Sequence, residues 1–185
     1  MNNALSTTLI ATAIILSTGC ATPARVDQMV STGEAQYRTA ATPLRNNLAL
    51  KEVTGGRETN PMWVSNVGSS ELEQALEESL KAVGLLAARQ GGEYLLTADL
   101  MKLDQPMLGL DMTVTSTVRY IVAERATGKS VFDETLTAPY TARFSDALLA
   151  PERLKLANEG AIRTNIGKLL ERLVHLKFDK VAVAK

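Results

Sequence analysis

The sequence predicts an α+β fold, a two-layer sandwich of about four mostly antiparallel strands with two helices on one face. Two observations carry this prediction. Residues 110–122 alternate between apolar and polar side chains, which is typical of a strand with one buried face. Residues 70–89 and 151–176 instead repeat apolar residues every three or four positions, which is typical of amphipathic helices. The predicted order of elements is β-α-β-β-β-α.

Four segments are predicted as strands. Residues 48–53 are expected to form a short strand that ends at a Gly-Gly pair. Residues 94–103 are expected to form a second strand, with apolar residues at both odd and even positions. In the third strand, one face carries Leu110, Met112, Val114, Val118, Tyr120 and Val122, and the other carries Asp111, Thr113, Thr115, Thr117 and Arg119. The turn ATGK leads into the fourth strand, residues 131–140, so the last two strands are expected to form a hairpin.

Two segments are predicted as helices. In the first, Ser70 and Glu73 form an S-x-x-E pair that is typical of a capping box, and the helix is expected to end near Arg89. The second helix follows Pro151, which suits a first helical turn. Its apolar stripe consists of Ile162, Ile166, Leu169, Leu173 and Leu176. Both helices are expected to cover one face of the sheet and to leave the threonine-rich face of the third strand to water.

The only cysteine of the chain, Cys20, follows an apolar run over residues 4–18. That run is shorter than the roughly 20 residues that a membrane-spanning helix needs, and it fits the apolar region of an export signal. Thr18, Gly19 and Cys20 resemble the end of a bacterial lipoprotein signal, in which the cysteine receives lipid and becomes the first residue of the mature chain. Two other fates remain open for Cys20: secretion with cleavage after Ala21, and burial in a core.

These features divide the chain into four parts. Residues 1–19 are expected to be a lipoprotein signal peptide, and residues 20–46 a lipidated N-terminus followed by a flexible tether. Residues 47–178 would form a single α+β domain, and residues 179–185 a loose tail. A flexible stretch of about 25 residues reaches roughly 25–30 Å, which would hold the domain clear of a bilayer.

Composition and motifs argue against several classes of function. The 20 Lys and Arg residues balance the 20 Asp and Glu residues, so no basic surface for nucleic acid is indicated. A single cysteine excludes a cysteine-rich metal site, and we expect no metal and no other cofactor. The sole histidine, His175, ends a predicted helix, and the phosphate-loop-like RATGKS joins two strands where a strand and a helix are required. We therefore expect no catalytic residues.

Two predicted loops carry large apolar residues. The loop NPMWVS includes Met62 and Trp63, the only tryptophan, and the loop DQPMLGLD includes Met107 and Leu108. Each loop could fold back over the end of the sheet. Alternatively, the four residues could form an exposed patch for a protein partner, because tryptophan and methionine are enriched in interfaces. We take Met62, Trp63, Met107 and Leu108 as hypothetical partner-binding residues.

Five segments connect the chain to known proteins: VTGGRETNPMWVSNV, ELEQALEESLKAVG, KLDQPMLGLDMTVTSTVRY, ATGKSVFDETLTAPYTARFSDALL and ERLKLANEGAIRTNI. Through them, residues 48–176 resemble a group of uncharacterised bacterial lipoproteins. The element order is also similar to the periplasmic domains of curli-secretion (CsgG) and penicillin-binding-protein activator (LpoB) lipoproteins. Some members of the closer group are labelled UDP-N-acetylglucosamine acyltransferase, a class built as a β-helix of six-residue repeats with a catalytic histidine. This chain has no six-residue repeat.

The resemblance and Cys20 together imply a lipoprotein that is anchored in the outer membrane and faces the periplasm. Ala21 favours the outer membrane, because aspartate at that position retains many lipoproteins in the inner membrane. The expected role is non-enzymatic binding or scaffolding in the cell envelope, with the membrane and an envelope protein as partners. Two alternatives remain open: an envelope enzyme of acyl- or glycosyl-transferase type, and a soluble secreted binding module.

Overall fold

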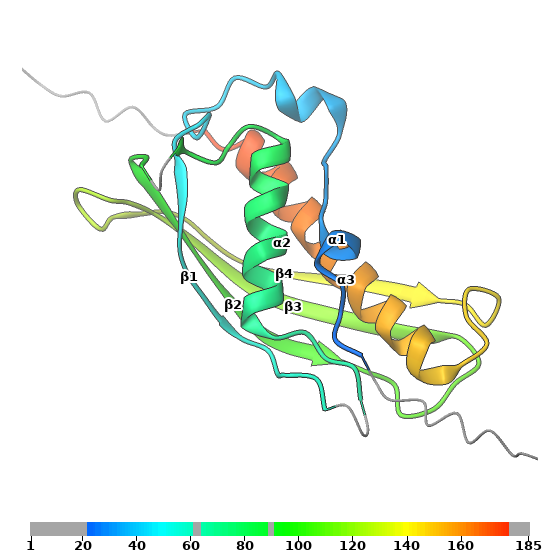
Figure 1. The fold of residues 1–185 in the computed structure, drawn as a ribbon. Coiled ribbons are helices and arrows are strands. Elements are labelled where there is room, and N and C mark those ends of the chain that lie inside the picture. The colour runs from blue at the N-terminus through cyan, green and yellow to red at the C-terminus, as the bar shows by residue number, and fades with distance from the viewer. Residues whose placement is uncertain (1–21, 61–63, 89–90, 178–185) are drawn as a thin grey trace, which may run out of the picture.

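The computed structural model describes residues 22–60, 64–88 and 91–177. Its sheet consists of β1 (Leu48–Gly55), β2 (Tyr94–Asp104), β3 (Met112–Glu124) and β4 (Ser130–Ala142), in the order β1-β2-β3-β4 (Figure 1). Helices α2 (Ser69–Ala82) and α3 (Ala150–Val174) cover one face of this sheet. β1 pairs with β2 in parallel because α2 carries the chain back between them, and the other two pairings are antiparallel. The predicted α+β sandwich is confirmed, and the predicted order of elements holds from β1 to α3, although two short helices precede β1.

The alternating pattern around residue 116 corresponds to β3, which lies inside the sheet. Its predicted inner face is buried from Met112 to Val122, and the polar Ser116 shares that face. Leu110 departs from the prediction, since the strand begins only at Met112 and the Leu110 side chain is exposed in the preceding loop. The alternation therefore located the strand correctly and extended it too far at its start.

The opposite face of the sheet is polar and exposed to water, as the threonine pattern of the third predicted strand indicated. Thr113 and Thr117 face threonines of β4, and their hydroxyls contact those of Thr141 and Thr137 at 2.8 and 3.3 Å. On the same face, the Arg119 guanidinium donates to both carboxylate oxygens of Asp133, at 2.9 and 2.8 Å. This hydrogen bonding lowers the pKa of the Asp133 carboxyl and raises the pKa of Arg119.

Helix α3 is attached to the sheet by a buried polar network as well as by apolar packing. The fully buried Asn165 donates from Nδ2 to the Leu136 carbonyl at 2.9 Å and accepts at Oδ1 from the Tyr120 hydroxyl at 3.0 Å. The hydroxyl of Ser116 donates to the Ala161 carbonyl at 2.9 Å. Burial raises the pKa of the Tyr120 phenol, so it remains a donor. Because unpaired buried polar groups are costly, these pairings fix the position of α3 along β3 and β4.

Close contact between α3 and β4 requires a glycine in the middle of the helix. A Cβ atom on Gly160 would lie only 2.2 Å from Cδ1 of the Tyr140 ring. Glycine inside a helix ordinarily destabilises it by about 1 kcal/mol relative to alanine. Here the glycine lets the helix backbone approach the Tyr140 ring. Arg163 also packs on this ring, with its guanidinium carbon 5.6 Å from the ring centroid.

Helix α2 differs from its predicted limits at both ends. Its N-cap is Gly68 and no side chain caps it, so the predicted capping box of Ser70 and Glu73 is wrong and both residues lie within the helix. The helix ends at Ala82, well before Arg89, because Gly84 adopts a positive φ of 71° and turns the chain back toward β1.

The N-terminal segment is packed against the domain, so the predicted flexible tether is wrong for residues 22–46. This segment contains α1 (Val26–Met29) and the 3-10 helix η1 (Ala35–Arg38), and it crosses α2 and α3 (Figure 1). Met29, Tyr37 and Leu44 are buried in the main core. Their spacing of eight and seven residues matches no single regular element, which is why the sequence pattern did not reveal them.

An ion pair joins the N-terminal segment to α3. The Arg25 guanidinium donates to both carboxylate oxygens of Glu159 at 3.0 Å, and the Arg25 backbone N–H donates to the same carboxylate at 2.9 Å. The Glu159 side chain is 1% exposed and the Arg25 side chain 46%. The hydrogen bond to Glu159 raises the pKa of Arg25. Further toward the start of the chain, Lys155 Nζ donates to the Thr22 hydroxyl at 3.1 Å.

We expect Arg25→Ala to lower the free energy of unfolding by about 1–3 kcal/mol, because it leaves the buried Glu159 carboxylate with fewer partners. Arg38→Ala is the matched control, since Arg38 is exposed at the end of η1, and we expect a change within about 0.5 kcal/mol. Urea unfolding of both variants measures the difference. Equal losses would show that the ion pair does not hold the segment.

Candidate functional site

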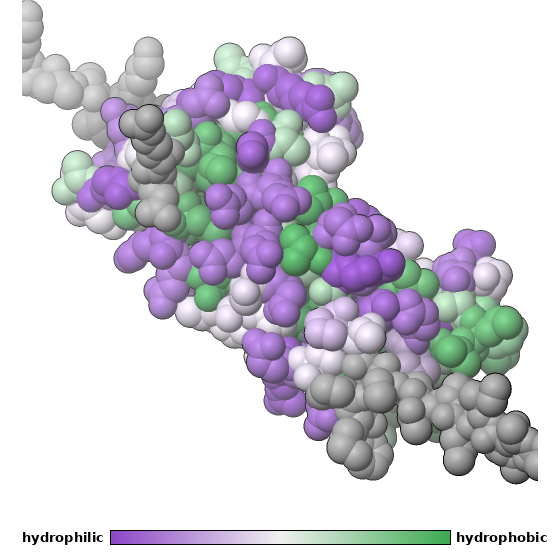
Figure 2. Space-filling view, viewed as in Figure 1, coloured by the Kyte–Doolittle hydropathy of each residue, from purple (hydrophilic) through white to green (hydrophobic). Residues whose placement is uncertain are grey.

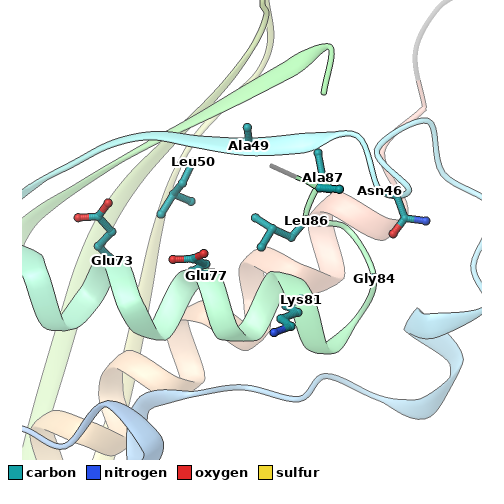
Figure 3. Close-up of a pocket in the computed structure, with 10 residues that line it drawn as sticks. Asn46, Ala49, Leu50, Glu73, Glu77, Lys81, Gly84, Leu86 and Ala87 are labelled. Carbon is teal, nitrogen blue, oxygen red and sulfur yellow. The ribbon is translucent and has the colours of Figure 1, made fainter. Parts of the chain in front are cut away.

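A groove of about 530 Å³ lies between β1 and helix α2 (Figure 3). Leu50 and Leu86 give it an apolar side, and Glu73, Glu77 and Lys81 line it from α2. The three charged residues are spaced four apart, so they lie on the same face of the helix. In Figure 3 the Glu73 and Glu77 carboxylates are directed toward β1. The groove therefore combines an apolar surface with two exposed carboxylates.

Strand β1 is an outer strand of the sheet, and part of its free edge faces this groove. The loop after α2 covers only the start of that edge, where Leu48 donates to the Leu85 carbonyl at 3.1 Å and accepts from the Ala87 N–H at 2.8 Å. Beyond Leu48, no other strand of the described residues pairs with this edge. An open strand edge beside an apolar groove suits an extended segment of a partner, which can add to the sheet as a further strand.

The polar residues that sequence analysis weighed for chemistry do not come together. His175 is the C-cap of α3, exposed, with its ring edge-on to Tyr37 at a centroid distance of 6.3 Å. The RATGKS segment is the turn between β3 and β4, as expected, with Gly128 at a positive φ of 72°. Within residues 22–60, 64–88 and 91–177, no group of three or more His, Cys, Asp and Glu side chains is placed to hold a metal ion.

Of the four hypothetical partner-binding residues, Met107 and Leu108 lie in the β2–β3 loop and are 96% and 90% exposed. Met62 and Trp63 lie outside the described residues, as does Cys20. The loops that carry the two pairs are adjacent, because Gln105 Nε2 donates to the Ser65 carbonyl at 2.9 Å. Binding of a partner by these four residues stays a prediction.

Sequence analysis missed a second exposed apolar loop, which joins β4 to α3. Phe144, Leu148 and Leu149 are exposed there. The signal was present: a Leu-Leu pair stands just before Pro151, outside any alternating or helical repeat.

Among the helices that the structure describes, none has the length and apolar character needed to cross a bilayer. The fold also differs from the β-helix that the acyltransferase label implies, because it is a four-stranded sheet covered by helices.

Comparison with known proteins finds structures with a similar fold and identifies no family for the chain. No family model matches the chain, and no curated protein matches it. Among solved structures, it is similar to a protein from Xanthomonas campestris of the family model DUF330, with a TM-score of 0.53 and 14% identity over 69% of this chain and 83% of that chain. At this identity the likeness shows a shared fold alone.

Two further solved structures with lower scores are described as lipoproteins. One is a putative lipoprotein from Caulobacter crescentus, with 12% identity over 76% of this chain and 90% of that chain and a TM-score of 0.47. The other is a minor lipoprotein from Acinetobacter baumannii, with 13% identity over 71% of this chain and 94% of that chain and a TM-score of 0.46. None of the three proteins is described as an enzyme.

Proposed function

We propose that this chain is a lipoprotein of the bacterial cell envelope, anchored through Cys20, whose domain binds or scaffolds other envelope components without catalysing a reaction. The observation that carries the proposal is the short distance in sequence between Cys20 and the first described residue that contacts the fold. The cysteine ends an export-like signal and lies only two residues before Thr22, where the chain already contacts α3. Ala21 supports the outer membrane, with the domain on its periplasmic side.

The location of the first described residues supports lipidation over a core role for Cys20. Thr22 and Pro23 are exposed, and the chain first becomes buried at Ala24. The described chain thus begins at the surface of the domain, two residues after Cys20, which suits an acyl chain that enters a bilayer. Several acyl chains on one cysteine anchor a protein firmly, since each buried CH₂ contributes about 0.8 kcal/mol.

Binding is supported over catalysis by the character of the β1–α2 groove. An acyl- or glycosyl-transferase would need a nucleophile or acid and base groups that converge on a substrate. The groove instead offers a strand edge, an apolar surface and the carboxylates of Glu73 and Glu77 on one helix face. These features suit an extended, basic segment of an envelope protein.

Labelling cells with palmitate tests the anchor. We expect label in the wild-type protein and none in Cys20→Ala, because the cysteine sulfur and the new amino terminus would carry the acyl groups. Mass spectrometry of the wild-type protein should show a lipid-bearing chain that begins at Cys20. An unlipidated chain that begins at Thr22 would instead support the alternative of ordinary secretion and would refute the anchor.

Charge reversal in the groove tests the binding role. We expect Glu77→Lys to reduce the retention of a basic envelope partner several-fold, because it replaces a carboxylate that faces β1 with a cation. Glu78→Lys is the matched control: Glu78 is an exposed neighbour on α2 that does not line the groove. Both variants should keep the wild-type melting temperature. Equal retention by the two variants would argue against the groove as the binding site.

A further inference from the structure

Large apolar side chains are concentrated at one end of the molecule. Six of the seven that are exposed in the described part of the chain belong to the β2–β3 and β4–α3 loops; the seventh is Met101. The six, which we call the apolar tip, are Met107, Leu108, Leu110, Phe144, Leu148 and Leu149. Apolar surface over the β4–α3 loop is visible at the right-hand end of Figure 2.

The two loops of the apolar tip are held together by defined contacts. Met112, at the start of β3, pairs with Ala142, at the end of β4. The β2–β3 loop therefore ends beside the point where the β4–α3 loop begins. The Phe144 backbone N–H then donates to Asp111 Oδ1 at 2.9 Å, across from one loop to the other. Arg153 packs 5.1 Å from the centroid of the Phe144 ring and donates to two carbonyls of the same loop. The loop backbones are therefore fixed while the apolar side chains face outward.

The start of the chain lies at this same end. Helix α3 begins at Ala150, directly after the β4–α3 loop, and Lys155 lies about 7–8 Å further along the helix axis. Because Lys155 contacts Thr22, the first described residue is held near the apolar tip. Cys20 precedes Thr22 by two residues, and two residues span at most about 7 Å. A lipid on Cys20 would therefore hold this end of the domain, and no other, at the membrane.

We propose that the apolar tip is a second membrane contact, and that its occupant is the lipid surface that holds the acyl chains of Cys20. This inference rests on the proposed lipid anchor. The anchor brings the tip to the bilayer, and transfer of its exposed side chains from water into the interface is favourable. Charges of both signs, such as Arg143 and Asp146, flank the tip, so the contact does not depend on anionic lipid.

This contact would orient the groove away from the membrane. β1 begins at Leu48, opposite Tyr94 at the start of β2, whereas the β2–β3 loop follows Asp104 at the other end of that strand. Ten residues of strand separate these two positions, which corresponds to roughly 33 Å. The part of the groove beside Leu48 therefore faces the aqueous compartment when the apolar tip touches lipid.

Site-specific fluorescence tests the contact. The lipid blocks the sulfur of Cys20, the only native cysteine, so Leu108→Cys and Leu149→Cys each supply a single free thiol for an environment-sensitive fluorophore. The matched control is Ala126→Cys, in the exposed turn at the other end of β3. Each labelled lipoprotein is reconstituted into vesicles of phosphatidylcholine, and separately into vesicles of phosphatidylethanolamine and phosphatidylglycerol.

We expect a blue-shifted emission at positions 108 and 149 in both kinds of vesicle, and several-fold stronger quenching by spin-labelled lipid than at position 126. Equal emission and quenching at all three positions would overturn the inference. A shift that depends on protein concentration without lipid would indicate a second copy, and a shift that requires added envelope protein would indicate a protein partner; either overturns it.

The lipid on Cys20 is verified separately by mass. Its absence would refute the proposed anchor together with this inference, whereas lipid present with an unshifted probe refutes only the membrane contact of the tip.

Discussion

The ion pair between Arg25 and Glu159 determines how the start of the chain is related to the rest of the fold. Glu159 is almost completely buried, and a buried carboxylate without a partner is strongly unfavourable. Arg25 must therefore remain beside α3, and the chain that follows it packs against both α2 and α3 through α1. Met29 then joins the core that these helices share with the sheet. A segment that looks like a linker in composition is thus part of the domain.

This constraint gives the domain two distinct ends. At one end lie the apolar tip and Thr22, which follows the proposed lipid anchor by two residues in the sequence. The β1–α2 groove extends toward the other end, where Asn46 and Gly84 line it. A long flexible tether would have left the orientation of the domain free. A lipid on Cys20, as proposed, would instead be joined to a segment that is docked to α3, and it would couple the direction in which the groove faces to the plane of the membrane.

The elements that sequence analysis located correctly are those whose pattern repeats locally. The alternation of β3 and the apolar stripe of α3 each follow from a regular element that buries one face. The hairpin between β3 and β4 was likewise predictable, because Gly128 stands in a short turn between two strand patterns. These local signals were sufficient for the fold class and for the order of the elements.

The features that escaped prediction depend on residues far apart in the sequence. Arg25 is 134 residues from Glu159 in the sequence. Nothing in the sequence around either residue indicates that the two form an ion pair. The backbone N–H of Ser31 is bonded to Ser79 Oγ, a partner that no periodicity reveals. Glu77 is an exposed residue of α2, and only the position of β1 makes it a groove residue. Non-local contacts of this kind define both the docked segment and the candidate site.

Amide hydrogen exchange of the full chain tests most directly whether the N-terminal segment belongs to the domain. The backbone N–H groups of Arg25, Ser31 and Asn46 each donate to a partner elsewhere in the fold, at 2.9, 3.0 and 3.0 Å. The account predicts that these amides exchange slowly, with protection that approaches that of β3. Exchange at the rate of an unstructured chain would show that the segment is a tether, and would contradict the claim that the anchor holds one end of the domain at the membrane.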